Sequence, residues 1–266
     1  MLKALNRVIL PLFSALGLVA WGLGCAPASR QPLVVGMELN YPPFEMINAQ
    51  GQPVGVSVDL AEALAQYLQR PLRIENIPFD GLIPALKTGK IDLIISSMTA
   101  TRERAQSIAF SAPYLRTGLC LLVNRRANIH SLEQADQPGC AVVVKQGTTG
   151  QLYARTHLHR ARVLVVEKED ACVLEVVQGK AQAFIYDQMS IFNHWQRNPQ
   201  TTDALLTPFQ EEDWAIGLRL GDEALKARVN AFLSAYRAEG GFQRLGDKYL
   251  KEQKAAFQKL GVPFEF

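Results

Sequence analysis

The segment between residues 91 and 114 constrains the fold more than any other part of the sequence. It begins with a short apolar run, residues 91–95, directly before a cluster of hydroxyl groups. The cluster consists of Ser96, Ser97, Thr99 and Thr101. An apolar run of this length predicts a buried strand, and the hydroxyl residues predict a helix start beyond it. Ligands of open α/β sheets bind just outside the carboxyl ends of strands, so we expect a binding site here.

The polar groups expected at this site suit a carboxylate ligand. Helix N-termini attract anions, and a guanidinium group can hold both oxygens of a carboxylate. Arg104 lies in the first turn of the expected helix and supplies such a guanidinium. The segment therefore predicts a site for a small molecule that carries a carboxylate.

Short apolar runs and helical patterns alternate along the rest of the chain. Helices are expected to begin near Ser57 and Asp80, each acting as an N-cap. The expected strands besides residues 91–95 are residues 33–37, 72–77, 119–124, 141–145, 163–166, 183–186 and 214–220. Strands that alternate with helices predict an α/β protein with parallel sheets and crossover helices.

Two motifs indicate a family. I-D-L-I-I-S-S-M-T-A-T-R-E-R, followed by F-S-A-P-Y, resembles the signature of bacterial extracytoplasmic amino-acid-binding proteins, the solute-binding protein family 3. These are receptors of ABC transporters for polar amino acids. Nearly the whole chain after residue 31 follows the family pattern. The resemblance implies a two-lobed periplasmic-binding-protein fold of type II, with two parallel-sheet lobes joined by a two-crossover hinge.

The resemblance also implies where the lobes and the ligand-binding residues lie. Lobe 1 is expected at residues 31–117 plus 210–266, and lobe 2 at residues 118–209. Hinged lobes of this kind close around a ligand. The expected ligand-binding residues are Glu38, Tyr41, Phe79, Ser96, Ser97, Thr99, Arg104, Thr148, Thr149 and Asp187.

Each end of an amino acid has expected partners among these residues. Arg104, the Thr99 backbone N–H, Ser97 and Thr149 would hold the carboxylate. Asp187 would meet the ammonium group. Simpler roles remain open for three residues: a solvated loop carboxylate for Glu38, a core side chain for Phe79, and an N-cap for Asp187.

The side chain of the ligand is expected to be basic. Glu38 would attract arginine or lysine by Coulomb attraction, provided that its carboxylate faces the ligand. Glutamine or another neutral polar amino acid is the alternative. The expected partners are thus a free amino acid and the permease subunits of an ABC transporter.

An enzyme on the same scaffold is the alternative from another class. The stretches L-E-Q-A-D-Q-P-G and A-R-T-H-L-H-R-A-R-V-L are similar to cyclohexadienyl dehydratases, which act on prephenate or arogenate. Elimination there needs a general acid in the cleft. That family carries a glutamate three positions after the aspartate matched by Asp187, where this chain has Ser190. A serine hydroxyl cannot serve as this acid near neutral pH, so we expect a receptor and no enzyme.

Residues 1–24 predict a secretory signal peptide. Two basic residues precede an apolar stretch that ends in small residues and is short for a membrane span. The dipeptide before Ala26 resembles a lipobox, in which Cys25 would carry the lipid, although the usual leucine is shifted by one position. A-P-A at residues 26–28 is the alternative cleavage site. We expect an extracytoplasmic protein, in the periplasm or on the outer cell surface, anchored through Cys25.

Composition argues against several other functions. The net charge is only +3, and the basic residues are scattered without interleaved aromatic residues, which argues against nucleic-acid binding. The four histidines form no cluster at metal-ligand spacing, and Q-G-T-T-G at residues 146–150 lacks the spacing of a phosphate-binding loop. We therefore expect no metal, no cofactor and a monomer. Cys120, Cys140 and Cys172 are expected to be buried thiols, with a disulfide between two of them left open.

Overall fold

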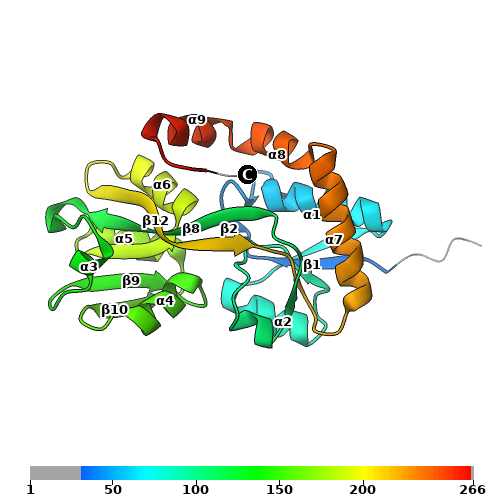
Figure 1. Ribbon diagram of the computed structural model, residues 1–266, viewed down its shortest axis with the longest axis horizontal. Coiled ribbons are helices and arrows are strands. Elements are labelled where there is room, and N and C mark those ends of the chain that lie inside the picture. The colour runs from blue at the N-terminus through cyan, green and yellow to red at the C-terminus, as the bar shows by residue number, and fades with distance from the viewer. Residues whose placement is uncertain (1–30, 265–266) are drawn as a thin grey trace, which may run out of the picture. The chain divides into compact units, whose positions relative to one another are not determined.

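The computed structural model describes residues 31–264 (Figure 1). The expected signal peptide and Cys25 lie outside the described residues. Two α/β lobes make up the described part of the chain, each built on a five-stranded sheet. The predicted two-lobed fold is confirmed, although both sheets are mixed rather than purely parallel.

The first sheet has the strand order β5-β1-β6-β13-β7. Strand β1 pairs in parallel with β5 and β6, while β13 is antiparallel to β6 and β7. The chain enters β13 on its return from lobe 2, which explains the reversed direction. The strands are β1 (Leu33–Met37), β5 (Leu72–Asn76), β6 (Leu93–Ile94), β7 (Ala109–Phe110) and β13 (Gly217–Leu218).

The second sheet has the strand order β10-β9-β11-β8-β12. Strand β9 reads A-V-V-V-K and is buried at all five positions, as expected for a central strand that is parallel to both neighbours. Strand β8 runs antiparallel to β11 and β12. The strands are β8 (Leu115–Asn124), β9 (Ala141–Lys145), β10 (Arg162–Val166), β11 (Ala183–Asp187) and β12 (Thr202–Trp214).

Helices cover both sheets. In α1 the buried residues recur at three- and four-residue steps, so that one face packs on the core. In lobe 1 the helices are α1 (Val56–Leu68), α2 (Leu82–Lys87), α7 (Glu223–Ala238) and α8 (Gly241–Tyr249). In lobe 2 they are α3 (Leu132–Ala135), α4 (Thr149–His157), α5 (Glu169–Val177) and α6 (Gln188–Arg197).

Short elements complete the architecture. A three-stranded sheet follows β1, and three 3-10 helices lie in loops. The short strands are β2 (Asn40–Tyr41), β3 (Glu45–Ile47) and β4 (Pro53–Val54). The 3-10 helices are η1 (Phe79–Gly81), η2 (Arg104–Gln106) and η3 (Arg125–Ala127). The last helix, α9 (Lys251–Leu260), packs Phe257 against Phe192 of α6 with ring centroids 4.8 Å apart.

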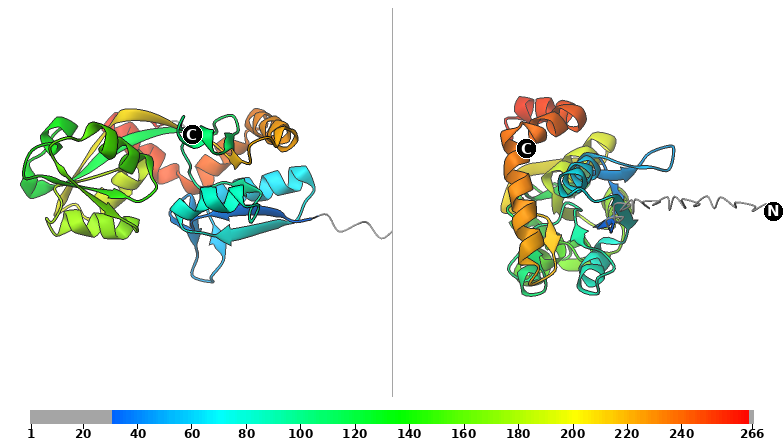
Figure 2. Two further views of the ribbon diagram at one scale, coloured as in Figure 1. Left: turned by 90° about the horizontal axis from the view of Figure 1, so that it is seen from below. Right: turned by 90° about the vertical axis from the view of Figure 1, so that its right-hand side faces the viewer.

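Strands β8 and β12 connect the lobes, as Figures 1 and 2 show. They pair from Leu115 with Trp214 to Asn124 with Thr202, with a register shift between Leu205 and Gln210. A Cβ atom at Gly118 would lie 2.5 Å from the Gln210 carbonyl oxygen, so glycine permits the close approach of the two strands. The residues at which the chain changes lobe, 117 and 210, remain a prediction.

Three local predictions are wrong. The chain forms a turn and the 3-10 helix η2 after β6, where an α-helix start was expected. Ser57 lies inside α1, whose N-cap is Gly55. The Ser57 hydroxyl donates to the Glu45 carboxylate and does not cap the helix. Asp80 accepts a hydrogen bond from the Gln146 amide of the other lobe and does not cap α2.

Two further findings concern the described residues. Cys120 and Cys172 are buried, Cys140 is partly buried, and all three are free thiols. Within residues 31–264, no helix is long and apolar enough to cross a membrane.

Candidate functional site

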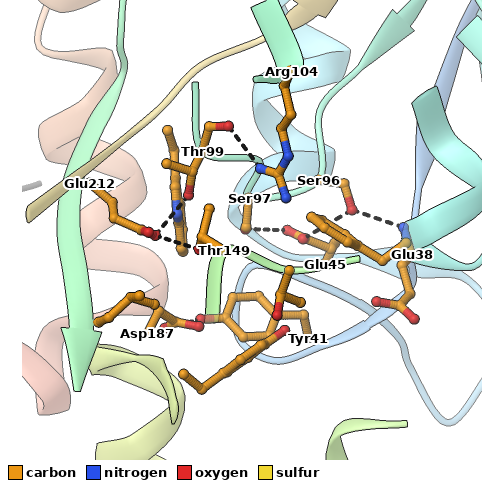
Figure 3. A pocket seen from close by; sticks show the side chains of 15 residues that line it. Glu38, Tyr41, Glu45, Ser96, Ser97, Thr99, Arg104, Thr149, Asp187 and Glu212 are labelled. Atoms are coloured by element: carbon orange, nitrogen blue, oxygen red, sulfur yellow. Dashed lines mark hydrogen bonds between the residues drawn. The ribbon is translucent and has the colours of Figure 1, made fainter. Parts of the chain in front are cut away.

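The site is a pocket between the lobes that is lined by 15 residues (Figure 3). All ten residues that the sequence predicts for the ligand line it. Five lining residues were not predicted: Glu45, Leu119, Tyr186, Glu212 and Trp214. The structure thus brings the predicted set together from both lobes, while the contact of each residue with a ligand stays a prediction.

Arg104 bridges the two lobes at this pocket. Its guanidinium donates to the Thr99 carbonyl at 2.8 Å and to the Gly147 carbonyl at 2.9 Å. It also lies 5.4 Å from the centroid of the Phe79 ring. Burial lowers the pKa of Arg104 to about 10, which keeps the group cationic at neutral pH. Arg102, two residues earlier, is exposed.

Glu38 already has a cationic partner within the chain. The ammonium group of Lys145, at the end of β9, donates to the Glu38 carboxylate across the lobes. The Lys145 side chain is 4% exposed and its nitrogen lies 5.5 Å from the Phe79 ring centroid. The solvated-loop role is therefore wrong for Glu38, and its charge is balanced before any ligand binds. The sequence analysis did not identify Lys145.

Glu45 is a pocket carboxyl group that was not predicted from the sequence. It lies at the start of β3 and is 1% exposed. Its oxygens accept hydrogen bonds from Ser57 at 2.6 Å, Ser97 at 3.1 Å and Ser96 at 3.4 Å. Burial raises the pKa of Glu45 to about 8. Within the described residues Glu45 has no ion-pair partner.

Asp187 is the N-cap of α6, which is one of the two roles expected for it. Its Oδ1 accepts from the Ser190 backbone N–H at 3.1 Å and from the Tyr41 hydroxyl. Burial raises the pKa of Asp187 to about 7, so removal from water is the dominant effect on this carboxyl group. The N-cap prediction is confirmed, and the carboxylate still lines the pocket.

Glu212 occupies a position between the two lobes. Its Oε2 accepts from the Thr99 hydroxyl at 2.9 Å and from the Thr149 hydroxyl at 3.0 Å, as Figure 3 shows. Its Oε1 accepts from the Gln210 amide at 3.0 Å. Burial raises the pKa of Glu212. The sequence around Glu212 does not single it out, because Glu211, Glu212 and Asp213 form a run of three acidic residues, which is typical of a solvated edge.

Aromatic rings form one wall of the pocket. Tyr41 stacks on Phe44 and meets Trp214 edge-on, with centroids 5.5 and 6.0 Å apart. Tyr186 meets Tyr41 edge-on at 6.1 Å. These contacts fix the Tyr41 ring, whose hydroxyl contacts Asp187, so that a ligand would meet a rigid surface.

Ser190, the position that decides the dehydratase alternative, does not line this pocket. Its hydroxyl donates to Glu169, which also contacts His194 at 2.7 Å. At position 190 the chain therefore presents no acidic side chain to the ligand pocket. Among the described residues, no cluster of three or more His, Cys, Asp or Glu side chains could hold a metal ion.

Comparisons with known proteins agree with this geometry. The chain is 33% identical over 234 residues to an L-arginine-binding protein of Pseudomonas aeruginosa, covering 84% of this chain and 89% of that protein. The binding component of an ABC transporter from Wolinella succinogenes, complexed with lysine, superimposes with a TM-score of 0.78 and 31% identity, covering 85% and 98% of the two chains.

A third relative bears on the enzyme alternative. An ancestral amino-acid-binding protein, described as a precursor of cyclohexadienyl dehydratase, superimposes with a TM-score of 0.76 and 32% identity, covering 83% and 95% of the two chains. All three relatives are described as binding proteins or binding components. The family model of bacterial extracellular solute-binding proteins, family 3, matches residues 33–252. The chain therefore belongs to family 3 of the bacterial extracellular solute-binding proteins.

Proposed function

We propose that the protein binds a basic L-amino acid, arginine or lysine, in the interlobe pocket and delivers it to an ABC uptake transporter. The observation that carries the proposal is Glu45, a buried carboxylate in the pocket with no ion-pair partner among residues 31–264. Burial raises the pKa of Glu45 and keeps it mostly protonated in the empty receptor, and a cationic ligand side chain would stabilise its ionised form as a buried ion pair.

The charges around the pocket support the same ligand. Four carboxyl groups line it. Among residues 31–264, the positive groups beside them are Arg104, which lines the pocket, and Lys145, which pairs with Glu38. Arginine or lysine carries two positive groups and one negative group, so it brings the pocket closer to neutrality. The carboxyl groups are Glu38, Glu45, Asp187 and Glu212.

The ends of the ligand would bind at different sides of the pocket. The α-carboxylate would approach Arg104, and the α-ammonium group would approach Asp187. Figure 3 shows Glu45 and Asp187 on different sides of the Tyr41 ring, which separates the two cationic ends of such a ligand. Tyr41 and Phe79 would pack against the aliphatic part of the side chain.

The ion pair between Lys145 and Glu38 favours a second candidate, glutamine. With Glu38 neutralised, a neutral side chain could bind at that end, and Glu45 could stay protonated. The relative named for L-arginine and the structure complexed with lysine support the basic ligand instead.

The proposal extends to the signal peptide and to the lipid anchor at Cys25. A family of extracellular solute-binding proteins works outside the cytoplasm. We propose that residues 1–24 direct export and that Cys25, lipidated, holds the receptor at the membrane. Metabolic labelling with a radioactive fatty acid, with Cys25→Ser as the control, would test the lipid anchor.

Isothermal titration calorimetry would test the ligand, on protein freed of bound ligand by partial unfolding and refolding. We expect binding of arginine, lysine and ornithine, and weaker binding of citrulline, which is the neutral analogue of arginine. In Glu45→Gln, arginine and citrulline should bind almost equally. A preference for glutamine or citrulline would replace the basic ligand by a neutral one. Binding of prephenate alone would overturn the receptor itself.

A further inference from the structure

Glu212 accepts hydrogen bonds from the hydroxyl groups of two residues that the family resemblance places at the ligand carboxylate, Thr99 through its backbone N–H and Thr149. Thr99 and Thr149 donate to the same oxygen, Oε2, from lobe 1 and lobe 2 respectively. Each threonine hydroxyl has a single hydrogen. While both hydrogens are engaged by Glu212, neither hydroxyl can donate to a bound carboxylate.

The surroundings of Glu212 suit a bound anion. Thr149 is the first residue of α4, a helix of nine residues whose N-terminus favours negative charge. Arg104 lies close enough to interact electrostatically with Glu212, although the two form no ion pair. Glu212 is 5% exposed, so its carboxylate is held inside the site. A carboxyl group of the chain thus occupies a position prepared for a carboxylate.

The location of Glu212 in the fold adds a mechanical consequence. It lies on β12, where its partner across the ladder is Thr117 of β8, and these two strands connect the lobes. One oxygen of a connecting strand therefore joins hydroxyl groups of both lobes. This contact stabilises a closed arrangement without a ligand.

We propose that Glu212 is an internal latch that replaces the ligand carboxylate in the empty receptor. The ligand carboxylate displaces Glu212 from Thr99 and Thr149, and the cost of this displacement lowers the affinity. The latch therefore lowers the affinity for ligands that carry a carboxylate and leaves the affinity for ligands without one unchanged, because only a carboxylate takes over the two hydroxyl groups. This inference rests on the proposed amino-acid ligand, but the behaviour of the empty receptor does not.

The test compares Glu212→Gln with Glu211→Gln, the exposed neighbour on the same strand. Calorimetry would measure arginine and agmatine, which is arginine without its carboxylate. In Glu212→Gln we expect arginine to bind about tenfold more tightly, a gain of about 1.4 kcal/mol. Agmatine should gain nothing, and Glu211→Gln should resemble the unchanged protein with both ligands.

Small-angle X-ray scattering of the ligand-free receptor would test the latch without any ligand. Glu212→Ala should have a larger radius of gyration than the unchanged protein, because alanine offers the hydroxyl groups of Thr99 and Thr149 no acceptor, whereas glutamine keeps one. Equal loss of affinity for arginine and agmatine would instead make Glu212 a partner of the ligand ammonium group and overturn the latch. An unchanged radius together with unchanged arginine affinity would also overturn it. If the unchanged protein binds no amino acid, the proposed function fails, and scattering alone decides on the latch.

Discussion

Binding of arginine should become tighter with rising pH because of Glu45. Burial raises the pKa of Glu45 to about 8, so the free receptor carries this group mostly protonated at pH 7. A cationic side chain placed against Glu45 needs the ionised form. Ionising it at pH 7 costs about 1.4 kcal/mol, which corresponds to about a tenfold loss of affinity. The affinity should rise about tenfold per pH unit below pH 8 from this group alone and level off above pH 8.

Citrulline isolates the contribution of Glu45. Burial also raises the pKa of Asp187, to about 7, and that of Glu212, so these groups would add their own proton exchange when an amino acid binds. Those exchanges are common to arginine and citrulline, so they cancel when the two ligands are compared. Only arginine presents a positive charge to Glu45. The logarithm of the ratio of the two dissociation constants should therefore change by about one per pH unit between pH 5.5 and 7.5.

Isothermal titration calorimetry at several pH values would measure this ratio. Repeating each titration in two buffers that differ in ionisation enthalpy gives the number of protons released. Arginine should release about one proton more than citrulline at pH 6.5. In Glu45→Gln the difference in protons should vanish. Parallel pH profiles of arginine and citrulline in the unchanged protein would refute the pairing of Glu45 with the ligand side chain.

Three further predictions follow from the same contacts. The raised pKa of Glu45 means that the folded state binds a proton which the unfolded state releases. Stability of the ligand-free protein should therefore fall by about 1.4 kcal/mol per unit as pH rises from about 4.5 to 8; Glu45→Gln should flatten the curve in urea unfolding. Asp187→Asn keeps an N-cap oxygen for Ser190, so the thermal midpoint should stay within a few degrees while amino-acid binding falls by 100-fold or more, on the order of 3 kcal/mol for a lost charged contact. Unaffected binding would show that Asp187 does not contact the ammonium group. Gly55→Ala should lower the free energy of unfolding by about 2–4 kcal/mol, as measured by chemical denaturation. The reason is that φ is 129° at Gly55 and a Cβ atom there would lie 2.3 Å from the Phe44 carbonyl oxygen. A smaller decrease would mean that the loop relaxes.

The sequence alone determined the architecture and most of the pocket. Apolar runs that end in polar residues mark strands whose carboxyl ends face a ligand, as with β6 and Ser96. These patterns involve only neighbouring residues and recur along the chain, so the strands can be predicted without the tertiary structure. The family motif added the positions of Arg104 and Asp187, and both line the pocket. Local patterns failed at Ser57 and Asp80, where a tertiary hydrogen bond outweighs the tendency of these residues to cap a helix.

Only the tertiary structure decided the charge of the pocket. Lys145 meets Glu38 from 107 positions away, and Glu212 meets Thr99 from 113 positions away. Neither pair has a signature in the neighbouring residues. Lys145 meets Glu38 only when the lobes face each other, and Thr99 meets Glu212 where the end of β12 lies beside the segment after β6. The same packing removes Glu45 from water and raises its pKa to about 8. Electrostatic interactions depend on distance in space and on burial, and local sequence patterns contain neither quantity.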